Sequence, residues 1–170
     1  LSGGVDSAVI AVLSKLAFDD ESLAIMMPIN SCEEDEKDAK LVIDKFKLNA
    51  IKIDLSKTYS VFTDSVEKGD NSMAYANIKP RLRMTTLYYY AQLKRYLVVG
   101  TSNKSEFTVG YFTKYGDSGS DLMPLVDFTK REIFELAKFL KVPDKIIQKP
   151  PSAELFENQT DEDEMGFSYD

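Results

Sequence analysis

The opening of the chain, residues 2–7, combines two adjacent glycines with two serines and a carboxylate, and an apolar stretch at residues 8–13 follows directly. The apolar stretch predicts a buried helix that begins at this turn. The first N–H groups of a helix have no partner within it and coincide with the positive end of its dipole, so such a turn is an anion site. Gly3 and Gly4 allow the backbone to approach an oxyanion closely and to take positive φ angles.

The side chains of the turn narrow the choice of anion. Ser2 and Ser7 supply hydroxyl donors, whereas Asp6 repels a phosphate unless a cation lies between them. Mg²⁺ is a cation that bridges carboxylates and phosphates, so the turn suggests a magnesium-bound phosphate. A simpler alternative is a capped helix after a tight turn, with Asp6 or Ser7 as the N-cap. The turn is not a Walker loop, because no Gly-Lys-Ser/Thr follows it.

Composition excludes several functional classes. The chain has 170 residues, enough for one domain with a real core. Its formal net charge of −7 argues against nucleic acid or an anionic membrane as a partner. It has no histidine, which excludes Ser-His-Asp and Cys-His nucleophiles within the chain. Cys32 is the single cysteine, and no apolar run is long enough to span a bilayer, so we expect a reduced, cytoplasmic setting.

The order of predicted elements is that of an α/β protein with a twisted parallel sheet flanked by helices. After a helix at about residues 6–17, we predict a strand at 23–27, an amphipathic helix at 33–47 and a strand at 50–55. Further helices are predicted at 58–66, 72–78, 81–95 and 128–140, a strand at 96–100, and a loop at 101–125. A strand is expected before the opening turn, and we interpret residues 1–170 as one domain that has been trimmed at both ends.

Three later segments are candidates for chemistry. Residues 100–106 follow a predicted strand, where ligands bind in open α/β sheets, so Thr101 is a candidate ribose or phosphate contact and Glu106 a second Mg²⁺ ligand. Spacing alone favours the alternative of a polar loop with Glu106 in solvent. The loop at 112–121 is a candidate lid or an ordinary turn. Arg81 is a candidate for binding a phosphate or carboxylate. The more common alternative is a surface arginine whose aliphatic stem packs on the fold. The acidic run at 161–164 is expected to be solvated.

Together and in this order, the motifs resemble the NAD synthetase family, of the ammonia-dependent type. The opening Ser-Gly-Gly-x-Asp-Ser is the signature of the ATP pyrophosphatase (PP-loop) enzymes, which split ATP into AMP and pyrophosphate. The matching blocks cover nearly the whole chain, at residues 2–7, 81–84, 100–106, 110–117, 151–155, 159–162 and 164–166. The blocks from residue 110 onward are not shared with other PP-loop enzymes, which makes the resemblance specific. It implies the adenine nucleotide alpha hydrolase-like fold.

The resemblance implies a ligase that forms an amide. ATP adenylates the nicotinate carboxylate of deamido-NAD with release of pyrophosphate, and ammonia then displaces AMP. Carboxylate attack on the α-phosphate depends on charge neutralisation and positioning more than on acid–base groups, which suits a chain without histidine. The resemblance also implies a homodimer with deamido-NAD bound across the interface, and the predicted helix at 81–95 is our candidate for part of that contact.

The resemblance also implies roles for individual residues. The ATP contacts would be Ser2, Gly3, Gly4, Val5, Asp6, Ser7, Thr101, Lys130 and Ser152. The deamido-NAD contacts would be Arg81, Lys114 and Asp121, and the Mg²⁺ ligands Asp6 and Glu106. No side chain is assigned as catalytic. The chain departs from the family at Pro80, where many members have alanine. Members also continue past this C-terminus into a tail with a His-Lys pair, so we expect an incomplete substrate site.

Other functions remain open from the residues alone. One is another PP-loop adenylating ligase, GMP synthetase-like or tRNA-modifying, although the charge of −7 and the lack of cysteine motifs count against tRNA. Another is a catalytically silent nucleotide-binding or dimerisation module. The nitrogen donor, free ammonia or glutamine, is open as well. ATP-dependent pyrophosphate release separates the ligases from the silent module, and its dependence on deamido-NAD separates NAD synthetase from the other ligases.

Overall fold

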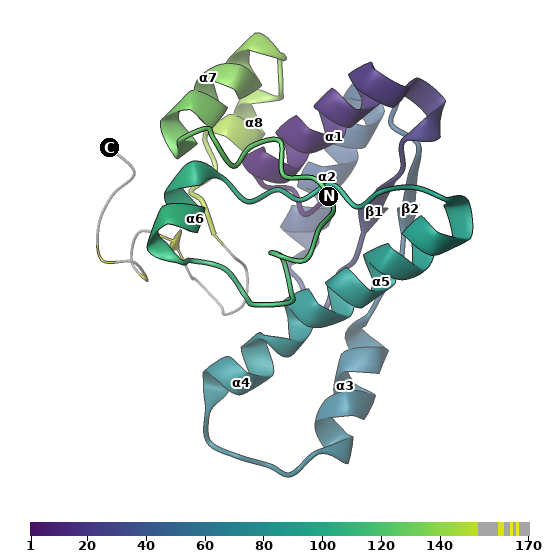
Figure 1. Cartoon of the computed structure of the whole chain (residues 1–170), viewed down its shortest axis with the longest axis vertical. Coiled ribbons are helices and arrows are strands. Elements are labelled where there is room, and N and C mark those ends of the chain that lie inside the picture. The colour runs from purple at the N-terminus through teal and green to yellow at the C-terminus, as the bar shows by residue number, and fades with distance from the viewer. Residues whose placement is uncertain (153–159, 162–163, 165, 167–170) are drawn as a thin grey trace.

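A computed structural model describes residues 1–152, 160, 161, 164 and 166 of the chain. Two parallel strands, β1 (Ala24–Met26) and β2 (Ala50–Lys52), pair in the register Ala24 with Ala50 and Ile25 with Ile51. Helices surround the two strands (Figure 1). The predicted α/β class, a parallel sheet flanked by helices, is therefore confirmed.

The helices around the first half of the chain follow their sequence patterns. α1 (Val5–Phe18) begins at the glycine turn and buries one apolar side, and a short 3-10 turn, η1 (Asp19–Glu21), follows it. α2 (Glu33–Phe46) has four acidic residues in its first turn and a lysine in its last, the arrangement that the helix dipole favours. The predictions at 6–17 and 33–47 are thus confirmed to within about one residue.

The core joins α1 and α2 to two helices from the other end of the chain, α7 (Lys130–Phe139) and α8 (Asp144–Ile147). Its fully buried members include Val9, Val42, Ile133 and Ile146, one from each helix. α7 packs directly on α1, so residues more than a hundred positions apart lie side by side (Figure 1). This packing brings the start of α7 close to the opening turn.

A second group of helices extends away from this core. α3 (Ser56–Ser65) and α4 (Ser72–Ala76) project from the rest of the molecule, and α5 (Ile78–Lys94) leads back from them (Figure 1). Pro80 lies in the first turn of α5, where its missing N–H breaks no helical hydrogen bond. No helix in the described ranges is long and apolar enough to cross a membrane.

Two sequence predictions about residues 96–125 are wrong. A strand needs a continuous ladder of hydrogen bonds with a neighbouring strand. Residues 96–100 form only a single parallel bridge, between Val99 and Leu122, so they are not a strand. The predicted loop contains the helix α6 (Lys104–Val109). Asn103 and Glu106 form a capping box at its start, and Gly110 ends it with φ of +74°.

We predict that Ile133→Ala lowers the free energy of unfolding by about 3 kcal/mol, because Ile133 is completely buried between α7 and α1 and truncation leaves a cavity. Phe139, on the same helix, is 80% exposed, so Phe139→Ala is the matched control and should change stability by less than about 0.5 kcal/mol. Urea denaturation followed by circular dichroism measures both. Equal effects would contradict the proposed packing of α7 on α1.

Candidate active site

The opening turn is held by its own hydroxyls and by α2. Ser2 Oγ and Ser7 Oγ lie 3.1 Å apart, the Gly4 N–H donates to Ser2 Oγ, and Ser7 Oγ donates to the Gly4 carbonyl. Gly3 is buried with φ of +101°, and a Cβ placed on it would lie 2.7 Å from the Asp35 carbonyl oxygen of α2. Position 3 therefore requires glycine for both its backbone angle and its space.

The N-cap of α1 is Gly4, with extended backbone and no capping side chain. The alternative in which Asp6 or Ser7 caps the helix is therefore wrong. Because glycine offers no side-chain acceptor, the first-turn N–H groups of α1 are left for a ligand. This is the arrangement that the anion-site interpretation requires.

Two carboxylates beside the turn share one buried cation. Lys130 Nζ lies 2.5 Å from Asp6 Oδ2 and 3.2 Å from Glu106 Oε1, and the Lys130 side chain is only 2% exposed. Lys130 is the first residue of α7, where a capping box between Thr129 and Glu132 fixes the start of the helix. The cluster therefore joins the N-terminal turns of α1, α6 and α7.

Asn103 completes this cluster and had no assigned role from the sequence. It is completely buried, and its Nδ2 donates to Asp6 Oδ1 at 3.1 Å. Its Oδ1 accepts from the Glu106 N–H at 2.9 Å, and its own backbone N–H donates to Glu106 Oε2 at 3.3 Å. Asn103 therefore contacts both carboxylates, that of Asp6 through its side chain and that of Glu106 through its backbone. The sequence signal for it is the Asn-x-x-Glu spacing of a capping box, which also predicts the helix that begins there.

Burial and mutual repulsion set the charges of the cluster. Burial, followed by the neighbouring Asp6 carboxylate, raises the pKa of Glu106 to about 7. Burial alone would lower the pKa of Lys130, but the Asp6 and Glu106 carboxylates outweigh it and hold this pKa above its ordinary value. Lys130 is therefore charged at neutral pH, and the two carboxylates converge on a position that a cation stabilises.

The donor set of this cluster fits Mg²⁺ bound together with a phosphate ligand. Mg²⁺ takes one or two protein carboxylates and completes its shell with phosphate oxygens and water. Asp6 and Glu106 supply two carboxylates. The described residues contain no group of three or more His, Cys, Asp or Glu side chains that could hold a metal. The residues thus suit a metal that arrives with a nucleotide rather than a cage built by protein alone.

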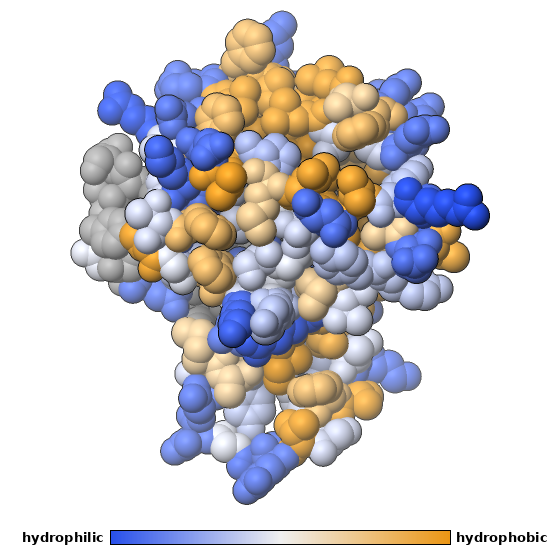
Figure 2. Space-filling model, viewed as in Figure 1, coloured by the Kyte–Doolittle hydropathy of each residue, from blue (hydrophilic) through white to orange (hydrophobic). Residues whose placement is uncertain are grey.

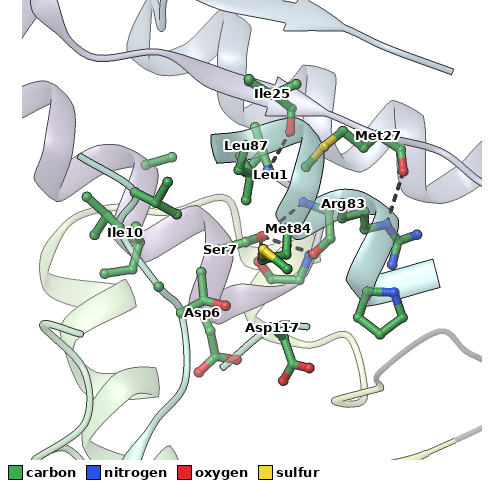
Figure 3. A pocket seen from close by; sticks show the side chains of 18 of the residues that line it. Leu1, Asp6, Ser7, Ile10, Ile25, Met27, Arg83, Met84, Leu87 and Asp117 are labelled. Atoms are coloured by element: carbon green, nitrogen blue, oxygen red, sulfur yellow. Dashed lines mark hydrogen bonds between the residues drawn. The ribbon is translucent and has the colours of Figure 1, made fainter. Parts of the chain in front are cut away.

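The turn and the cluster open on a cavity of about 790 Å³, which is within the size range of small-molecule sites. Asp6 and Ser7 from α1 face it together with Arg83, Met84 and Leu87 of α5 (Figure 3). The predicted ATP and metal residues that line it are Ser2, Gly4, Val5, Asp6, Ser7, Thr101, Glu106, Lys130 and Ser152. Gly3 instead packs against α2.

The three predicted deamido-NAD contacts are not among the described residues that line this cavity. Arg81 Nε donates to the Lys114 carbonyl at 3.2 Å, so these two residues lie together on the surface. Asp121 accepts hydrogen bonds from the Tyr88 hydroxyl and from the Val98 N–H. The structure thus joins Arg81 to Lys114 and gives Asp121 two partners within the fold.

Sequence reasoning missed other residues of the cavity. Arg83 donates through Nε to the Met27 carbonyl at 3.1 Å, and Asp117 faces the same space (Figure 3). Asp161 was expected to be solvated, but it is 4% exposed and accepts from the Tyr111 hydroxyl, so that expectation is wrong. Residues 153–155, 159, 162 and 165 of the motif blocks lie outside the described residues.

An α/β fold with this glycine turn and a carboxylate–lysine cluster beside a nucleotide-sized cavity defines a nucleotide-binding protein of the PP-loop class. Comparison with known proteins gives the family. The family model of NAD synthase matches residues 1–170, and the chain belongs to this family.

Individual relatives agree with the family. The chain is 56% identical to the NH3-dependent NAD⁺ synthetase of Finegoldia magna over all of its own length and 70% of the relative's. A solved NMN synthetase from Francisella tularensis is 40% identical with a TM-score of 0.94, covering 99% of this chain and 71% of the other. The NH3-dependent NAD synthetase from Campylobacter jejuni is 37% identical with a TM-score of 0.83, covering 88% of this chain and 65% of the other.

We predict that Gly3→Ala lowers the free energy of unfolding by about 1–3 kcal/mol, because alanine is strained at positive φ and its Cβ meets the Asp35 carbonyl. Gly69→Ala is the control, since a Cβ there meets nothing within 4 Å. It should change stability by less than about 0.5 kcal/mol. Thermal and urea denaturation provide the measurement. A Gly3→Ala variant as stable as the Gly69→Ala variant would show that the turn does not press against α2.

Proposed function

We propose that the chain carries out the ATP-dependent amidation of deamido-NAD to NAD. In this reaction the nicotinate carboxylate attacks the α-phosphorus of ATP, pyrophosphate leaves, and ammonia then displaces AMP from the acyl adenylate. Membership of the NAD synthase family and the names of the relatives support the reaction and the nitrogen donor. The observation that carries the proposal is the convergence of Asp6 and Glu106 on buried Lys130 beside the opening turn.

In this proposal the residues around the turn hold the phosphates of ATP. The first-turn N–H groups of α1 and the hydroxyls of Ser2 and Ser7 would bind phosphate oxygens. Lys130 would neutralise negative charge that grows on the leaving pyrophosphate, since its ammonium is fixed and buried in advance. The full set of proposed ATP contacts is Ser2, Gly3, Gly4, Val5, Asp6, Ser7, Thr101, Lys130 and Ser152.

Mg²⁺ is the proposed metal, with Asp6 and Glu106 as its protein ligands. When bound, it would supply charge neutralisation to the polyphosphate and hold its oxygens in place. Asn103 donates to the Asp6 carboxylate from its side chain and to the Glu106 carboxylate from its backbone N–H, so we expect it to support the metal site without touching the metal.

Arg81, Lys114 and Asp121 are the proposed contacts for deamido-NAD. Arg81 and Lys114 are exposed cationic residues joined through the Lys114 carbonyl, and cationic side chains suit the pyrophosphate of a dinucleotide. We also propose a homodimer in which α5 contributes to the interface. Tyr89 and Leu93 of α5 are each 63% exposed. Figure 2 shows further apolar groups in the lower part of the molecule, where α3 and α4 project. Exposed apolar side chains of this kind mark protein contacts when they are contiguous.

The test is to measure pyrophosphate release with purified protein, ATP, Mg²⁺, an ammonium salt and deamido-NAD, and to follow NAD formation in parallel. We expect one pyrophosphate for each NAD and no release when deamido-NAD is omitted. Pyrophosphate release without deamido-NAD would favour another PP-loop ligase. No release under any of these conditions would favour the silent nucleotide-binding module.

A second acceptor is favoured by one specific observation, the close match to a solved NMN synthetase. The corresponding reaction would amidate nicotinate mononucleotide, which has the same carboxylate but lacks the adenylate half of the dinucleotide. The ratio of kcat/KM for the two acceptors decides between them. We expect deamido-NAD to be preferred, and a preference for the mononucleotide would reassign the product to NMN.

We predict that Asp6→Asn lowers kcat/KM for ATP by at least about a hundredfold, because the variant removes one proposed metal ligand and one counter-ion of Lys130. The amide keeps the size of the side chain, and Glu106 remains as a partner for Lys130, so the far-UV circular dichroism spectrum should be unchanged. Asp44→Asn, at an exposed position of α2, is the control and should keep full activity. Retained activity in Asp6→Asn would count against the metal role.

A further inference from the structure

Two lysines from the C-terminal part of the described chain converge on one buried carboxylate of α2. Asp38 is 2% exposed, and Lys145 Nζ lies 2.7 Å from its Oδ1. Lys149 Nζ lies 3.8 Å from the other oxygen of Asp38 and 2.6 Å from Asp35 Oδ1. A buried carboxylate is stable only with such counter-charges, so these ion pairs fix α8 and the segment after it against α2.

The same part of α2 forms the back of the opening turn. A Cβ on Gly3 would lie 2.7 Å from the Asp35 carbonyl oxygen and 3.2 Å from Asp38 Cβ. The residues that anchor Lys149 are therefore those against which the turn packs. A shift of the Lys149 segment relative to α2 is thus also a shift relative to the turn.

Lys145 and Lys149 differ in their position relative to the cavity. Lys149 lines the cavity, and Ser152, three residues later, lines it too. Pro150 and Pro151 lie between Lys149 and Ser152 and restrict the backbone angles. The position of Lys149 therefore largely determines the position of Ser152. Lys145 has a half-exposed side chain and is not among the described residues that line the cavity.

We infer that Lys149 is a positioning residue for the ATP site: anchored on Asp35 and Asp38, it holds residues 150–152 at the cavity wall in a fixed relation to the opening turn. This inference rests on the proposed function, because Ser152 is a proposed ATP contact. Lys149 acts through the segment that it anchors, and Asp38 acts through Lys149. Lys145 shares the carboxylate but serves stability alone.

The experiment compares Lys149→Met with Lys145→Met, which each remove one cation from Asp38. Both variants should lower the melting temperature. Only Lys149→Met should weaken ATP binding, by roughly ten- to a hundredfold in Kd measured by calorimetry with Mg-ATP, because misplaced contacts lose affinity steeply. In the steady state the same variant should raise KM for ATP more than it lowers kcat. Lys149→Arg keeps the charge and should restore most of the affinity.

Three results would overturn the inference. They are equal losses of ATP affinity in the two methionine variants, unchanged affinity in Lys149→Met, and failure of Lys149→Arg to improve on methionine. The binding measurement does not depend on amidation. If wild-type protein binds Mg-ATP but forms no NAD, the proposed function fails while the comparison of the two lysines still tests the role of Lys149.

Discussion

The rest of the site depends on the ammonium of Lys130 between Asp6 and Glu106. These residues stand at positions 6, 106 and 130, and each lies in the first turn of a different helix. Without the ammonium, two partly buried carboxylates would face each other, and the pKa of about 7 at Glu106 shows the burial and repulsion that already act there. The ion pairs thus hold three helix N-termini together around one space.

The opening turn is held on two sides by residues that form ion pairs. On the cavity side, Asp6 is bound by Lys130 and Asn103. On the opposite side, Gly3 packs on the stretch of α2 that pairs with Lys145 and Lys149. The backbone N–H groups of the turn are therefore rigid before a ligand arrives, which is the condition for strong electrostatic binding.

Local patterns predicted most of the fold. The helices that became α1, α2 and α5 follow from apolar periodicity and charge, and their ends agree with expectation within a few residues. The error at 96–100 arose because apolar character predicts burial but not a neighbouring strand. α6 was missed although Asn103 and Glu106 form its capping box. Residue chemistry pointed to the opening turn and to Thr101 and Glu106, whereas Lys130 came from the resemblance alone. The contact of Lys130 with Asp6, 124 positions away, lies beyond any local pattern.

The net charge of −7 and the proposed binding of a polyphosphate are compatible, because they act over different distances. Exposed charges more than about 10 Å apart are screened by salt, so the acidic surface disfavours a long polyanion that needs many cations in a row. A single nucleotide meets only the local field of the cavity. There the N-terminus of α1 is the positive end of a helix dipole, Lys130 is balanced by Asp6 and Glu106, and burial weakens the screening. The proposed phosphate ligand thus depends on the helix dipole, on Lys130 and on a metal that offsets the two carboxylates, and it needs no basic surface.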